Sequence, residues 1–64
     1  MKLFIERENK HNEMDFKGSV KELLQKLEIN PETVLVVKND ALVQEDEALQ
    51  NTDVVKLISV ISGG

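Results

Sequence analysis

The 64-residue chain contains no cysteine, a single histidine (His11) and a single proline. Without cysteine it has no disulfide, no thiolate metal site and no thiol nucleophile, which agrees with a reducing cytoplasm. Because no second histidine or cysteine stands at ligand spacing, we expect His11 to be an exposed residue and the chain to bind no metal. The acidic run Glu45-Asp46-Glu47 is typical of a solvated loop rather than of a cation site.

Long apolar runs are also absent. None approaches the roughly 20 residues that span a bilayer, and charged residues come too early at the N-terminus for a signal-peptide core. We therefore expect a cytoplasmic protein without membrane contact. Twelve acidic and eight basic residues give a net charge of −4. This charge repels phosphate, so we expect no direct nucleic-acid binding and favour a partner with a basic docking surface.

The length allows one small domain, residues 1–64, which buries about 60% of its unfolded surface. Such a core leaves no room for an enclosed substrate cavity. Glu6 and Glu8 are the nearest approach to a catalytic carboxylate pair, and nothing indicates a pocket between them. We therefore expect no catalytic residues, no enzyme activity and a monomer when the protein is free.

Apolar residues alternate with polar ones at the N-terminus. Residues 1–7 predict a strand with Met1, Leu3 and Ile5 on one face. Polar residues 8–12 predict a turn, and the shorter alternation of Met14 and Phe16 predicts a second strand that completes a hairpin.

A helix is predicted next. Gly18 ends the second strand, and Ser19 with Glu22 has the spacing of a capping box. Val20, Leu23, Leu24 and Leu27 then form one apolar stripe on a helix of about ten residues. We expect the pair Asn30-Pro31 to end it.

Strands dominate the remainder. Residues 33–38 and 41–43 predict two strands around an Asn39-Asp40 turn, residues 44–47 a loop, Ala48-Leu49 one loose helical turn, and Val54 begins the last strand. The predicted fold class is therefore α+β, in the order β-β-α-β-β-β, with one helix packed on a mixed sheet. The residues expected to form its core are Met1, Leu3, Ile5, Met14, Phe16, Val20, Leu23, Leu24, Leu27, Val34, Val36, Val43, Val55 and Leu57.

The same alternation leaves apolar residues on the sheet face opposite the helix: Phe4, Leu35, Val37, Ile58 and Val60. Scattered exposed apolar residues are normal on any surface. Several of them on one uncovered sheet face instead favour a partner-binding patch.

The last strand leads into Ser62-Gly63-Gly64. Small residues are often tolerated at a frayed terminus. A tail without side chains can also pass through a narrow channel and present its terminal carboxylate to another protein's active site, and we favour this second interpretation.

These features together resemble the β-grasp, or ubiquitin-like, superfamily. Met1-Lys2-Leu3-Phe4-Ile5 is similar to the first strand of ubiquitin, and the order of elements before a terminal Gly-Gly is the same. The short length, Asn39-Asp40-Ala41-Leu42-Val43 and Val60-Ile61-Ser62-Gly63-Gly64 look closest to the ThiS/MoaD sulfur carriers. Within that group the chain looks most like the ubiquitin-related modifiers and the small archaeal modifier proteins. Ser62 departs from the Ala or Val that many sulfur carriers have there, and is reminiscent of the modifier branch.

The resemblance implies a defined chemistry. A ubiquitin-activating-type enzyme would use ATP and magnesium to adenylate the Gly64 carboxylate, while the chain itself binds no cofactor. The acyl-adenylate would become a thiocarboxylate that donates sulfur through a sulfur-transfer enzyme or tRNA thiolase. Ser62 and Gly63 would form the flexible reach, residues 62–64. The acceptor expected first is tRNA uridine, with molybdopterin and the thiamine thiazole close behind.

Two alternatives belong to other classes. The chain could be a protein modifier that Gly64 joins to target-protein lysines, or a non-covalent ubiquitin-like binding module with an incidental tail. In each of these interpretations the patch around Ile58 is the docking surface.

Overall fold

The computed structural model describes residues 1–60; Ile61, Ser62, Gly63 and Gly64 lie outside the described residues. The predicted tail, residues 62–64, therefore stays a prediction. In chain order the elements are β1 (Lys2–Ile5), η1 (Glu6–Glu8), β2 (Lys10–Glu13), β3 (Gly18–Ser19), α1 (Val20–Lys26), η2 (Pro31–Thr33), β4 (Val34–Lys38), β5 (Ala41–Val43), β6 (Ala48–Leu49) and β7 (Val54–Ser59), where η marks a 3-10 helix.

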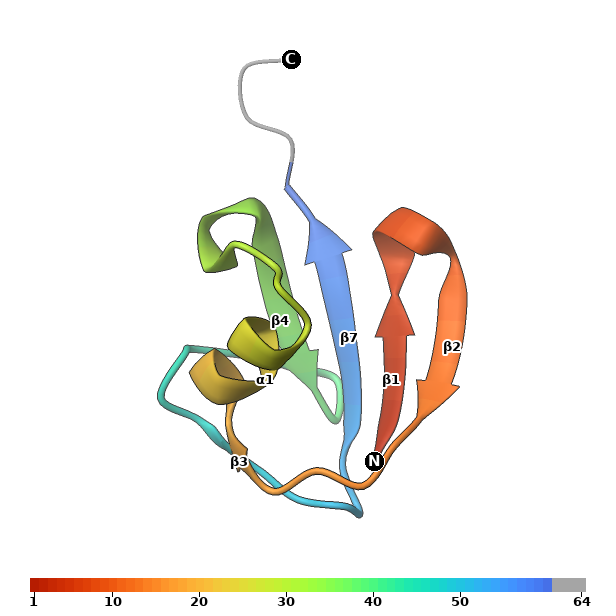
Figure 1. The fold of residues 1–64 in the computed structure, drawn as a ribbon, viewed down its shortest axis with the longest axis vertical. Coiled ribbons are helices and arrows are strands. Elements are labelled where there is room, and N and C mark those ends of the chain that lie inside the picture. The colour runs from red at the N-terminus through yellow and green to blue at the C-terminus, as the bar shows by residue number, and fades with distance from the viewer. Residues whose placement is uncertain (61–64) are drawn as a thin grey trace.

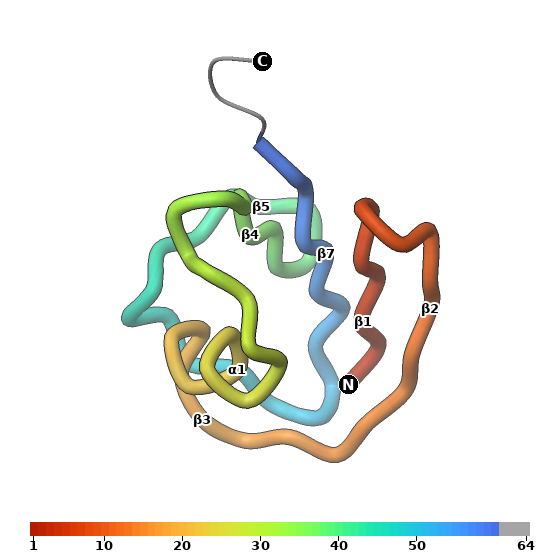
Figure 2. Tube along the Cα trace, turned by 45° about the horizontal axis from the view of Figure 1, so that its top comes forward, coloured from red at the N-terminus to blue at the C-terminus, as the bar shows by residue number. Residues whose placement is uncertain are grey.

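The main sheet has five strands in the order β2-β1-β7-β4-β5. The last strand, β7, is its centre and runs parallel to β1 and antiparallel to β4. One face is covered by α1 (Figures 1 and 2). The predicted fold class, one helix on a mixed sheet, is confirmed. Because β7 is hydrogen-bonded along both edges, the strand that leads to the chain end is held in the middle of the fold.

The core lies between α1 and the sheet. Its buried members are Met1, Leu3, Ile5, Val20, Leu23, Leu24, Val36, Leu49, Val55 and Leu57, and Met14, Phe16, Leu27, Ile29, Val34 and Val43 pack against them. Every predicted core residue is in one of these two groups. The prediction missed Leu49, which is 1% exposed.

Leu49 was missed because Ala48-Leu49 was predicted to be a helical turn, and this is wrong. These two residues form β6, which pairs antiparallel with β3 in a separate two-stranded sheet. Gly18 therefore lies within a strand instead of breaking one. The segment before β6 also covers the start of α1 (Figure 2), where the Val20 and Lys21 amides donate to the Glu47 and Glu45 carbonyls at 2.9 Å. Amides that a helix leaves unpaired in its first turn are thus satisfied.

The second strand comes earlier than predicted. The chain turns through η1, with Asn9 in the left-handed region at φ 50°, and β2 occupies Lys10–Glu13 rather than the Met14–Phe16 segment. All four β2 residues are exposed. An edge strand that buries neither face carries no apolar alternation, which explains why the pattern did not indicate it. Met14 still pairs with Met1, because its amide donates to the Met1 carbonyl at 3.0 Å.

The helix begins as predicted and ends earlier. Ser19 Oγ accepts from the Glu22 amide and the Glu22 carboxylate accepts from the Ser19 amide, both at 3.2 Å, so the capping box is confirmed. The helix spans Val20–Lys26 and stops before Asn30-Pro31. Within residues 1–60, no helix is long and apolar enough to cross a membrane.

The stop is a Schellman motif without glycine. The Ile29 amide donates to the Leu24 carbonyl at 2.9 Å and the Glu28 amide to the Gln25 carbonyl at 3.1 Å. Glu28 consequently has φ 58°, the left-handed region that glycine adopts most readily. These hydrogen bonds therefore hold Glu28, at the end of α1, in a backbone conformation that glutamate does not favour.

Replacing Glu28 by glycine is expected to stabilise the fold by about 0.5–1 kcal/mol, since the left-handed conformation costs glycine no steric strain. Urea unfolding of the wild type and of Glu28→Gly measures this directly. The matched variant Glu28→Ala removes the same carboxylate and keeps the Cβ, so it should gain nothing. Equal stability gains in both variants would contradict the account.

Candidate functional site

The face of the sheet opposite α1 brings the predicted patch residues together. Strand register places Leu35 opposite Ile58, and Lys56 opposite both Phe4 and Val37. Residues opposite one another in neighbouring strands share a face, so these side chains lie together. The Val60 amide continues the pairing with the Thr33 carbonyl at 2.8 Å, which keeps Val60 on the alternation of Lys56 and Ile58. All five predicted residues therefore occur on this open face.

Exposure marks the same face independently. The large hydrophobic side chains that are exposed within residues 1–60 are Leu35, Leu42, Val54 and Val60. Leu42 is opposite Val37, and Val54 is two residues before Lys56 on β7, so all four lie on the open face. We define the open-face patch as Phe4, Leu35, Val37, Leu42, Val54, Ile58 and Val60.

Two members of the open-face patch, Leu42 and Val54, were missed from sequence. Val54 follows from the same alternation that identified Ile58, so the signal was present. Leu42 follows only once the two-residue turn Asn39-Asp40 fixes the hairpin register. Both turn residues have positive φ, 49° and 69°, as a type I′ turn requires.

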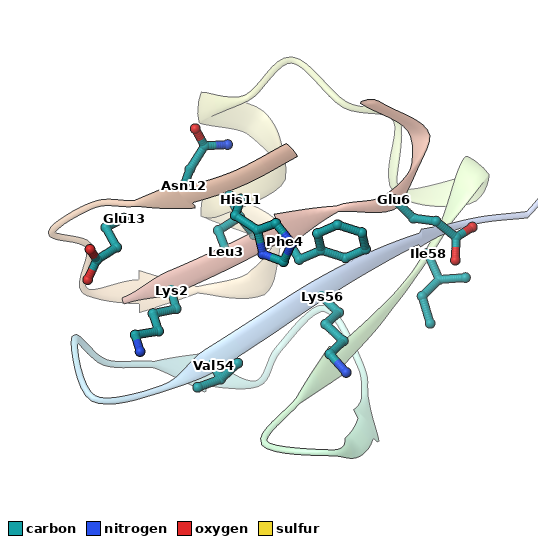
Figure 3. Close-up of a pocket in the computed structure, with 10 residues that line it drawn as sticks. All are labelled: Lys2, Leu3, Phe4, Glu6, His11, Asn12, Glu13, Val54, Lys56 and Ile58. Carbon is teal, nitrogen blue, oxygen red and sulfur yellow. The ribbon is translucent and has the colours of Figure 1, made fainter. Parts of the chain in front are cut away.

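Polar side chains border the open-face patch along β1 and β2 (Figure 3). His11 is exposed, as predicted, although it lies in β2 rather than in a loop, and its ring centroid is 4.5 Å from that of Phe4. Lys2 is directly opposite Glu13 across the β1–β2 pair. A shallow depression of about 730 Å³ runs over these residues and over Val54, Lys56 and Ile58.

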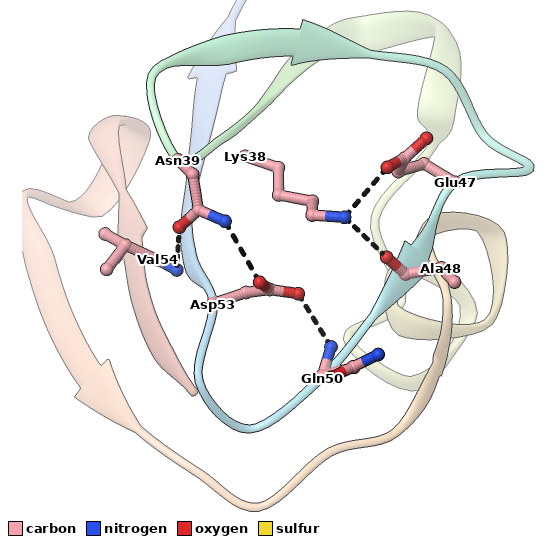
Figure 4. A network of polar contacts seen from close by, with 7 residues as sticks. All are labelled: Lys38, Asn39, Glu47, Ala48, Gln50, Asp53 and Val54. Carbon is pink, nitrogen blue, oxygen red and sulfur yellow. Dashed lines mark hydrogen bonds and ion pairs between the residues drawn. The ribbon is translucent and has the colours of Figure 1, made fainter.

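A polar clamp holds the start of β7 (Figure 4). Asp53 is 8% exposed, and its two carboxylate oxygens accept from Asn39 Nδ2 at 3.0 Å and from the Gln50 amide at 2.8 Å. The Asn39 Oδ1 atom accepts from the Val54 amide at 2.9 Å. These hydrogen bonds, first the one from Gln50 and then the one from Asn39, lower the pKa of Asp53. The clamp thus fixes the β4–β5 turn to the beginning of the central strand.

Replacing Asp53 by asparagine is expected to lower the melting temperature at pH 7 by about 5–10 °C. An asparagine side chain has one acceptor for two donors, so its NH₂ group would face an N–H group. Rotating Asn39 does not relieve this conflict, because its Oδ1 is already bonded to the Val54 amide. Thermal unfolding followed by circular dichroism measures the difference.

The difference should depend on pH. Because the folded-state pKa of Asp53 is lowered, its contribution to stability is present above the ordinary aspartate pKa of about 4 and is lost as the pH falls through the folded-state value. The melting temperatures of the wild type and Asp53→Asn should therefore converge in acid. A gap that is the same at pH 7 and in strong acid would contradict the role given to the carboxylate.

An ion pair secures the acidic loop. Lys38 Nζ contacts Glu47 Oε2 at 2.8 Å and donates to the Ala48 carbonyl at 3.0 Å. The hydrogen bond to Glu47 raises the pKa of Lys38. In residues 1–60, no group of three or more histidine, cysteine or acidic side chains is arranged to hold a metal ion. The Glu47 carboxylate is thus engaged in an ion pair with Lys38 that holds the loop.

The site has two parts along one strand. β7 contributes Val54, Ile58 and then Val60 to the open-face patch, and the chain continues from Val60 toward the predicted carboxylate. At this end of the sheet, β7 emerges beside η1 and η2 (Figure 1). The predicted reacting residues Gly64, Gly63 and Ser62 lie outside the described residues.

Comparison with known proteins agrees with this architecture. The sequence profile of the ThiS family matches residues 3–64. The sulfur carrier protein TtuB of Thermus thermophilus is 35% identical over 54 residues, covering 81% of this chain and 83% of its own length. An uncharacterized protein of Archaeoglobus fulgidus is 40% identical over 62 residues, covering 95% of this chain and 91% of its own.

Proposed function

The chain belongs to the ThiS family, and from this membership we propose that it is a cytoplasmic sulfur carrier that supplies sulfur for the thiolation of tRNA uridine. The observation that supports the proposal is the match through Gly64, which includes the final Gly-Gly. The similarity to a sulfur carrier of Thermus thermophilus supports the same role. In this role the chain is a substrate of other enzymes.

Gly64 is the residue acted upon. A partner enzyme of the ubiquitin-activating type would transfer AMP from ATP, with magnesium, to the Gly64 carboxylate and release pyrophosphate. Hydrosulfide then attacks the acyl carbon, the bond to the AMP oxygen breaks, and a thiocarboxylate forms as AMP leaves. Gly64 has no Cβ to hinder this attack, and Gly63 and Ser62 supply a narrow approach. The thiocarboxylate is ionised at neutral pH and needs no supporting base, so a carrier without cysteine is chemically sufficient.

The open-face patch is proposed as the surface that the activating enzyme grips. The segment from Val60 to Gly64 reaches at most about 14 Å when fully extended. An active centre that acts on Gly64 therefore works close to the end of β7, where the half-buried Ile58 and the exposed Val60 lie on the open face. Binding to the open-face patch would position β7, and therefore the residue at which the tail begins, relative to the enzyme's active centre.

The acceptor is tested in cells from which the gene has been deleted. Thiolated uridine in tRNA should disappear and return when the full chain is supplied, but not when a chain without Gly64 is supplied. Molybdopterin-dependent activity and growth without thiamine are measured in the same strains. Loss of either of these, with normal tRNA thiolation, would reassign the sulfur to molybdopterin or to the thiazole.

Protein modification is the second candidate, because Ser62 precedes the glycine pair as in the modifier-like branch. A tagged chain would then give a ladder of conjugates in cells that is lost on deleting Gly64. Function that survives removal of Gly63 and Gly64 would instead indicate a non-covalent binding module.

A further inference from the structure

Lys56 lies at the centre of the open-face patch and is surrounded by apolar side chains. Phe4 on β1 and Val37 on β4 are directly opposite it. Val54 and Ile58 flank it on the same face of β7, and Figure 3 shows the three side chains projecting from that strand. The side chain is exposed, and the ion pair found within residues 1–60 joins Lys38 to Glu47, so Lys56 makes none there.

The other lysine of this face is placed differently. Lys2 is directly opposite Glu13, so an opposite charge faces it across the β1–β2 pair, although the two side chains form no ion pair in residues 1–60. No acidic residue is directly opposite Lys56 on either neighbouring strand. Glu6 and Glu13 line the same depression, but neither forms an ion pair with Lys56 in residues 1–60. A partner that covers the open-face patch therefore removes water from an ammonium group that has no ion-pair partner among these residues.

We propose that the activating enzyme which covers the open-face patch places a carboxylate opposite Lys56, and that this ion pair selects the partner and sets its register. The inference rests on the proposed function. If the partner's surface were wholly apolar, the complex would bury the Lys56 ammonium group without a counter-charge, which is strongly unfavourable. A carboxylate on the partner would compensate that charge. The required partner surface is thus apolar with one acidic group, although the net charge of −4 favours a basic partner overall.

Two other occupants fit this face less well. A second copy paired through a twofold axis near the patch centre would bring its Lys56 toward the first, and like charges repel. A phosphate backbone would meet Glu6 and Glu13, which line the same depression. A protein carboxylate satisfies Lys56 without either conflict.

Steady-state activation by the host's activating enzyme tests the proposal with the full chain as varied substrate. Lys56→Glu should raise the KM for the carrier about tenfold or more, and Lys56→Gln by a smaller factor, with kcat retained because the tail is unchanged. Added salt should raise the KM of the wild type more than that of Lys56→Gln. Lys21→Glu is the matched control, since Lys21 is an exposed lysine of α1, on the covered side of the sheet.

A KM for Lys56→Glu within about twofold of that for Lys21→Glu would overturn the inference and leave the proposed function intact. Unchanged KM values together with self-association of Lys56→Gln would also overturn it, because Lys56 would then serve to keep copies apart. If the wild-type chain is not activated at all, the proposed function fails and the inference fails with it.

Discussion

Removal of Gly64 is expected to reduce adenylation of the carrier by at least about a hundredfold. The shortened chain still ends in a glycine carboxylate, but that carboxylate is one residue, about 3.5 Å, closer to the fold. Displacing a reacting group by about 1 Å can already cost a hundredfold in rate. Ser59 pairs with Val34 of β4, and the Val60 amide donates to the Thr33 carbonyl. Because these contacts fix the point at which the tail begins, β7 cannot shift along the sheet to bring the shortened tail back to the active centre. Exchange of pyrophosphate into ATP, dependent on the carrier, measures the effect.

Two controls separate an effect on the length of the tail from an effect on the stability of the fold. The truncated chain should melt at the same temperature as the wild type, because the removed residue follows the last strand. Gly64→Ala keeps the length and adds a Cβ beside the carbonyl, so it should lose activity by a smaller factor than the deletion. Adenylation of the truncated chain at the wild-type rate would contradict the proposed role of Gly64.

Leu49→Ala is expected to cost about 2–5 kcal/mol of folding free energy, as for other buried leucines. A domain of this size has a total stability on the order of 3–10 kcal/mol. The substitution should therefore remove a large share of the total stability. Leu49 is 1% exposed and is the residue through which β6 closes the core beside β3. A marked fall in the midpoint of urea unfolding would report it.

Leu42→Ala is the matched control because it removes the same atoms from a leucine that is 66% exposed. Its effect on stability should lie within about 0.5 kcal/mol. Any loss of activation in Leu42→Ala would then report contact with the partner rather than unfolding. Equal destabilisation by the two substitutions would contradict the assignment of Leu49 to the core and Leu42 to the surface.

Sequence pattern predicted the elements that bury one face. The stripe from Val20 to Leu27 and the alternation of β7 each reflect contact with the core, the capping box at Ser19 is a local signal of a helix start, and the structure has all three. The strands β2 and β6 were not predicted, because their own residues do not show the pattern of a buried face. β2 buries nothing, so its register depends on pairing with β1, and β6 is a strand because it meets β3 and not because of its own two residues.

The candidate site divides in the same way. Alternation alone assigned Phe4, Leu35, Val37, Ile58 and Val60 to one face. The isolation of Lys56 could not be predicted, since it depends on which residues of β1 and β4 are opposite it in the folded sheet. The left-handed Glu28 is likewise a consequence of tertiary packing around Ile29, where sequence rules expect glycine.

The most direct test of the sulfur-carrier proposal is the intact mass of the chain after incubation with the host's activating enzyme, ATP, magnesium and a sulfur source. We expect a mass shift equal to the replacement of one oxygen by one sulfur, located at Gly64 and absent when ATP is omitted. Formation of the acyl-adenylate without any such shift, under conditions where a known carrier of the family is converted, would contradict it.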